Sequence, residues 1–189
     1  MKKHDSSSNL QEKIDEYFKK CSDNMDGVLA YMRHKKDIYD YYQCGHKIYK
    51  MLPDIRNAIE LTLAIKLFGF FEDKHSKQGV SLERFLGLID GSIYDTGDAV
   101  STLKRELELF NSSATVKSII RIRHTMAHIN PHDKNPPSIE IKDVENAITW
   151  IKEFINKLHR LCGKSTFGYR YTSDFKCIFM DVLDVLKKA

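Results

Sequence analysis

The sequence has no apolar segment long enough to cross a bilayer and no paired cysteine motif. Its longest apolar segment, LTLAIKLFGFF at 61–71, contains Lys66 and is shorter than the roughly 20 residues of a membrane-spanning helix. The four cysteines include no pair at the CxxC spacing that is typical of zinc sites and redox motifs. We therefore expect a cytoplasmic protein that has reduced thiols and does not enter the membrane.

A large excess of charge of one sign is also missing. Lysine and arginine total 30 and aspartate and glutamate total 26, which leaves a formal net charge of +4. This mildly basic balance permits a nucleic acid as a partner but does not require one. With 189 residues the chain can form one domain with an adequate core.

No segment alternates polar and apolar residues as a β-strand does, and no internal repeat occurs. Apolar residues instead recur at steps of three and four, which indicates amphipathic helices. The polar segment 1–8 is expected to be a flexible N-terminal tail. The remainder, 9–189, is expected to be a single all-α domain with the architecture of a helical bundle.

The first half of the chain predicts long helices. One begins after Asn9, and Gly27 within it makes a break near 22–27 conceivable. A further helical segment covers 36–51. The next helix, 53–72, is apolar nearly all round and is therefore expected to be the most buried one. Shorter helices are expected after Ser81, over 98–110, over 113–129, from about 142 to Gly163 and over 175–189.

The stretch KSIIRIRHTMAHINPH at 117–132 gathers basic residues at the end of one predicted helix. At about 100° per residue, Arg123 falls among Ile119 and Ile120 on the apolar face, where an arginine is costly unless it is paired. Glu60, which lies among apolar residues of the helix 53–72, is its natural partner. The polar residues share another face and comprise Lys117, Arg121, His124 and His128.

The spacing of His124, His128 and His132 also suits a metal site, since histidines four residues apart lie on one helix face. However, Pro131 ends the helix before His132, and no HExxH motif supplies a general base. We therefore expect no metal and no other cofactor.

Phosphodiester chemistry suits these residue types better. A histidine with a pKa near neutrality can exchange a proton with the 2′-hydroxyl of RNA. An arginine can stabilise the charge that develops on the phosphoryl oxygens. Because RNA carries its own nucleophile, this reaction needs no metal ion.

Arg123, His124 and His128 match the Arg-polar-x(3–5)-His signature of the HEPN superfamily (higher eukaryote and prokaryote nucleotide-binding). The signature lies at the end of a late helix and is followed by a loop and another amphipathic helix. Upstream, LAIKLFGFFEDKHSKQGVSLERFLGLID at 63–90 resembles the abortive-infection AbiU branch of that superfamily. The resemblance covers about residues 35–160.

The resemblance implies a helical bundle that forms a homodimer, in which two motifs face one composite cleft. Active members cut RNA there without metal and leave a cyclic phosphate. By the same resemblance, His128 is the acid/base group, Arg123 stabilises the phosphate and His124 supports them. Such a protein acts as a toxin or phage-defence effector, or pairs with a nucleotidyltransferase-type antitoxin.

Three further residues are expected to support the site. Glu60 orients Arg123 from the central helix, while Arg121 and Asn130 flank the motif. The alternative function is a non-catalytic helical module that binds a nucleotide or a protein, such as the HEPN half of a toxin–antitoxin pair. That alternative predicts that Arg123 is sealed in an ion pair with Glu60. A purely structural bundle leaves the placement of Arg123 unexplained.

Overall fold

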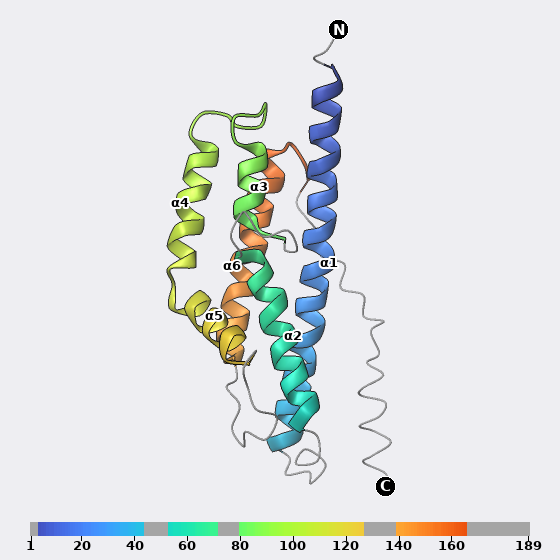
Figure 1. Cartoon of the computed structure of the whole chain (residues 1–189), viewed down its shortest axis with the longest axis vertical. Coiled ribbons are helices and arrows are strands. Elements are labelled where there is room, and N and C mark those ends of the chain that lie inside the picture. Colours follow the sequence, from blue (N-terminus) through green and yellow to red (C-terminus); the bar gives the residue numbers. More distant parts are fainter. Residues whose placement is uncertain (1–3, 44–52, 72–79, 127–138, 166–189) are drawn as a thin grey trace.

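The described part of the chain is entirely helical. The computed structural model describes residues 4–43, 53–71, 80–126 and 139–165, and over these ranges it contains six α-helices and no strand (Figure 1). The predicted all-α class is therefore confirmed. None of the described helices is long and apolar enough to span a membrane. The helices are α1 His4–Gln43, α2 Pro53–Phe71, α3 Leu82–Ile89, α4 Ala99–Asn111, α5 Ala114–Met126 and α6 Ile141–Leu161.

The helices form an elongated bundle. In Figure 1, α1 runs along one side and α4 lies on the other, while α2, α3 and α6 fill the space between them. The short helix α5 follows α4 after a tight turn and is inclined to the long axis of the bundle. It packs against both α2 and α6, and α2 in turn packs against α1. The C-terminal end of α5 contacts α2 at Phe68, close to the C-terminal end of α2.

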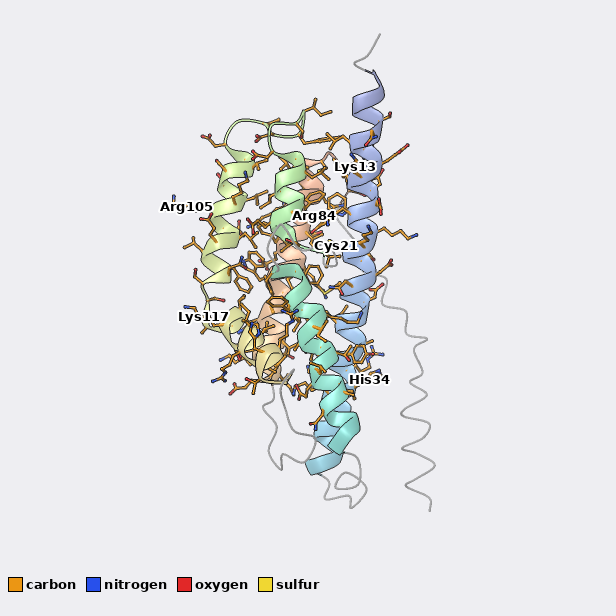
Figure 2. All side chains as sticks on the ribbon, in the orientation of Figure 1. Lys13, Cys21, His34, Arg84, Arg105 and Lys117 are labelled. Carbon is orange, nitrogen blue, oxygen red and sulfur yellow. The ribbon has the colours of Figure 1, made fainter. Side chains whose placement is uncertain are left out.

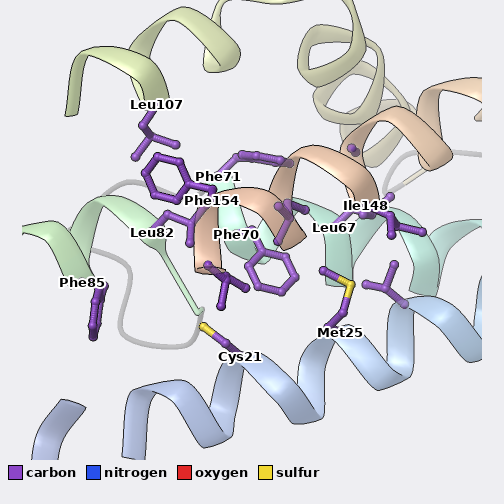
Figure 3. Close-up of a cluster of buried hydrophobic side chains, with 14 of the residues drawn as sticks. Cys21, Met25, Leu67, Phe70, Phe71, Leu82, Phe85, Leu107, Ile148 and Phe154 are labelled. Atoms are coloured by element: carbon purple, nitrogen blue, oxygen red, sulfur yellow. The ribbon is translucent and has the colours of Figure 1, made fainter. Parts of the chain in front are cut away.

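The core is built around α2, as its apolar composition predicts. Leu63, Leu67 and Phe70 of this helix are fully buried. Figure 3 shows Phe70 beside Met25 of α1 and Phe154 of α6, both of which are also fully buried. Each such side chain contributes on the order of 1.5–3 kcal/mol when it leaves water, so the contact between these three helices is a major source of stability.

Helix α1 is continuous through the position where the sequence suggested a break. The possible break near 22–27 does not occur, and α1 extends to Gln43, into the segment expected at 36–51. Gly27, the residue that suggested the break, is explained instead by the close approach of α2. A Cβ atom at Gly27 would lie 2.7 Å from Nζ of Lys66, so the glycine makes room for that side chain. Gly27 thus reflects packing between α1 and α2 and not a helix end.

Several predicted helix ends are confirmed by their capping interactions. The Ser81 hydroxyl accepts a hydrogen bond from the backbone N–H of Arg84 and begins α3. At the start of α5, Ser113 Oγ accepts one from the Val116 N–H at 3.3 Å. Gly163 follows α6 with a φ of 67°, the left-handed conformation expected of a residue after a helix. The helix predicted over 175–189 and residues 127–129 lie outside the described residues.

Candidate functional site

Helix α5 carries the predicted site and is held by a narrow apolar stripe. Val116, Ile119 and Ile122 are buried at successive three-residue steps. Arg123 lies at the edge of this stripe and is half-buried. The helix therefore places the arginine at the boundary between the core and solvent, where a charged group can reach a ligand.

The guanidinium of Arg123 lies over an aromatic ring of α2. Its Cζ atom lies 3.9 Å from the centroid of the Phe68 ring, which is a cation–π contact. The sequence analysis did not identify Phe68 as a contact of Arg123. The signal for it was the apolar character of α2 on all sides, since one of those sides must meet α5.

Glu60 is buried, as expected, and it joins three helices. Only 3% of its surface is exposed, and its Oε1 atom forms an ion pair with Lys35 of α1. Its Oε2 atom accepts a hydrogen bond of 3.3 Å from the backbone N–H of Ile139, just before α6. The expected contact between Glu60 and Arg123 stays a prediction.

Lys35 was not anticipated as the partner of Glu60. A signal was present in the sequence, because Lys35 continues the three- and four-residue steps of Val28 and Met32 along α1. A cation in register with an apolar stripe indicates a buried acid on the facing helix. That facing acid is Glu60.

The other predicted site residues divide into two groups. Arg121 and His124 are exposed on α5, on the same side of the helix as Lys117. His128, Asn130 and His132 lie outside the described residues. In the part of the chain that the structure describes, no group of three His, Cys, Asp or Glu side chains is placed to hold a metal ion.

A buried histidine that the sequence analysis did not single out lies far from this site. His159 of α6 is 7% exposed, and its Nδ1 atom lies 3.0 Å from the Ser165 carbonyl oxygen. Its ring centroid is 3.8 Å from that of Phe18 of α1. Burial lowers the pKa of His159 below its ordinary value. These contacts give His159 a place in the core of the bundle.

These features define an all-α protein with a basic site at the end of α5. Comparison of the chain with protein-family models, curated proteins and solved structures gave no match. The resemblance to the HEPN superfamily therefore depends on the Arg123–His124–His128 motif and on its helical context.

Proposed function

We propose that the protein is a metal-independent endoribonuclease of HEPN type that acts as a toxin or phage-defence effector. The observation that carries the proposal is the position of Arg123. Its guanidinium lies over the Phe68 ring, half-buried, in the last turn of α5 and five residues before His128 in the sequence. A cation held between the core and solvent suits the recognition of a phosphate.

The proposed reaction uses the RNA 2′-hydroxyl as nucleophile. Its oxygen attacks the adjacent phosphorus, the bond from phosphorus to the 5′-oxygen breaks, and a 2′,3′-cyclic phosphate and a 5′-hydroxyl result. His128 is the acid/base group that takes the proton of the 2′-hydroxyl or supplies one to the leaving oxygen. In a homodimer with a composite cleft, the two copies of His128 divide these tasks.

Arg123 is proposed to stabilise the charge on the phosphoryl oxygens during the attack. A planar guanidinium can donate two parallel hydrogen bonds to a phosphate while it stacks on an aromatic ring. A lysine in its place would supply the positive charge, but it could not donate two parallel hydrogen bonds or lie flat on the ring. His124 and Arg121, both exposed on α5, support the binding of the phosphate backbone.

The test is RNA cleavage by purified protein in the presence of a chelator, followed by analysis of the product ends. We expect cyclic phosphate ends and a rate that falls by about 10²–10⁴ in His128→Ala, the range typical of a lost acid/base group. Arg123→Lys should also lower the rate, whereas Lys19→Gln on α1 should not. Cleavage by His128→Ala at the wild-type rate, or cleavage that the chelator abolishes, would rule out this mechanism.

The alternative, a non-catalytic binding module, makes a different prediction for Arg123. It expects the arginine to be sealed in an ion pair with Glu60, whereas the ribonuclease requires the Arg123 guanidinium to be open to a phosphate. If the alternative held, Arg123→Ala would lower the free energy of unfolding by several kcal/mol, as for a broken buried pair. No RNA would be cut by the wild-type protein under any condition.

A further inference from the structure

Helix α5 carries a row of cations along its exposed side. Lys117, Arg121 and His124 are each exposed and are four and three residues apart, so they follow one side of the helix. We name these three residues the α5 basic row. Helix α5 contains no acidic residue.

The α5 basic row has no acidic partner among the described residues. Five lysines on the other helices form ion pairs, for example Lys36 with Glu145 at 2.6 Å and Lys157 with Glu106 at 2.5 Å. Among the described residues, no hydrogen bond or ion pair joins the side chains of the α5 basic row to an acid. Its positive charge is therefore directed to solvent.

The helix dipole does not account for this row. Cations stabilise a helix when they lie in its last turn, near the negative end of the dipole. His124 lies there, but Lys117 lies in the first half of α5. Near the start of α5, Asp143 accepts a hydrogen bond of 3.3 Å from Thr115 Oγ1. The row of cations therefore runs along the helix axis from Lys117, in the first half of α5, to His124 in the last turn, which also contains Arg123.

We propose that the α5 basic row binds the phosphate backbone of single-stranded RNA and directs the strand toward Arg123. The proposal rests on the proposed ribonuclease function, because it concerns the substrate of that site. A single row along one helix can follow the phosphates of one strand, and electrostatic rows of this kind bind single strands without sequence preference. The substrate class is thus unpaired RNA that extends on one side of the cut by several nucleotides.

The experiment measures binding separately from cleavage. The probe is a fluorescent single-stranded RNA of about 12 nucleotides with 2′-O-methyl groups throughout, which removes the nucleophile and prevents cleavage. Its dissociation constant is measured for the intact protein across a range of salt concentrations. Each phosphate contact to a single strand contributes about 0.7 to the slope of log affinity against log salt.

Lys117→Gln combined with Arg121→Gln should lower that slope by about 1.4 and, at about 0.1 M salt, weaken binding roughly 25-fold. The matched control is Lys13→Gln combined with Lys19→Gln, which removes the same charge from exposed sites on α1. Figure 2 shows Lys117 at the outer edge of α5 and Lys13 on the opposite side of the bundle. The control should bind as the wild type does.

Three results would overturn the proposal: absence of binding by the wild type, equal losses in the two double variants, or tighter binding to a duplex probe than to the single strand. If the slope falls as expected but unmodified RNA is never cut, the basic row stands and the proposed ribonuclease function fails. The two hypotheses are therefore distinguishable.

Discussion

At the residue scale, the ion pair with Lys35 stabilises the buried carboxylate of Glu60. Lys35→Met should lower the free energy of unfolding by about 3–5 kcal/mol, because it removes a counterion from a buried carboxylate. Adding Glu60→Gln should restore most of that loss, since a neutral amide can still accept the hydrogen bond from Ile139. Urea unfolding of the two variants measures both values.

The control for this pair is an ion pair on the surface. Lys104 and Asp90 form one in which the side chains are 40% and 49% exposed, so Lys104→Met should cost less than about 1 kcal/mol. Equal losses in Lys35→Met and Lys104→Met would contradict the argument that burial gives the Lys35–Glu60 pair its importance.

From the burial of His159 we predict how the free energy of unfolding changes with pH. Burial lowers the pKa of the folded protein's imidazole below 6.5, so the unfolded chain takes up a proton first as the pH falls. The contribution of neutral His159 is therefore fully present above pH 6.5 and is lost as the pH falls through the folded pKa. Between about pH 7 and about pH 5, His159→Gln should lose less stability than the wild type.

The measurement for His159 is the free energy of unfolding at several pH values. The ion pair between Asp15 and Lys164 lies beside the imidazole, and the two charges act on its pKa in opposite directions, so burial remains the main cause. Identical pH dependence in His159→Gln and the wild type would show that burial does not disfavour protonation there.

At the element scale, the close approach of α1 and α2 at Gly27 allows a stabilising substitution. Alanine is favoured over glycine within a helix by about 0.5–1 kcal/mol. The atoms in its way, Cδ to Nζ of Lys66, belong to the end of a flexible side chain. Gly27→Ala should therefore stabilise the protein, but by less than that full amount, because Lys66 must move.

Gly87 of α3 supplies the control, since no atom lies within 4 Å of the position of its missing Cβ. Gly87→Ala should therefore stabilise the protein by the full difference between alanine and glycine, about 0.5–1 kcal/mol. In a Lys66→Ala background, Gly27→Ala should gain as much as Gly87→Ala does. Thermal unfolding of the four variants checks this, and a loss of stability from Gly27→Ala in both backgrounds would mean that the helices themselves require the glycine.

The helices could be predicted from the sequence largely because their signals are local. Ser81, Pro53 and Gly163 mark helix ends through interactions with neighbours in the chain, and all three mark ends in the structure. Gly27 misled the analysis because the residue that explains it, Lys66, belongs to another helix. A glycine that ends a helix and one that admits a neighbouring side chain look alike in a sequence.

The same limit applies to the candidate site. Periodicity identified Arg123 and Glu60 as charges in apolar surroundings, and both are at least half-buried. Their contacts with Phe68 and Lys35 come from residues 25 or more positions away, and they depend on how the helices cross. Periodicity shows which residue needs a partner, but the partner itself is fixed only by packing.

At the scale of the whole molecule, one continuous core should make unfolding cooperative. Buried side chains from all six described helices form a single hydrophobic cluster. Trp150, the only tryptophan, stacks on Phe110 of α4 with ring centroids 4.0 Å apart and on Phe154 at 4.7 Å. Its fluorescence therefore reports the contact between α4 and α6, which lies away from α1.

Urea unfolding followed by Trp150 fluorescence and by far-ultraviolet circular dichroism should give coincident transitions. The circular dichroism signal includes the 40 residues of α1, so earlier melting of that helix would separate the two curves. Lys35→Met should move both curves together, although Lys35 belongs to α1 and Trp150 reports the contact between α4 and α6. If only the circular dichroism curve moved, α1 would be a separate folding unit, and the ion pair with Glu60 would not transmit its stability to the helices that hold Arg123.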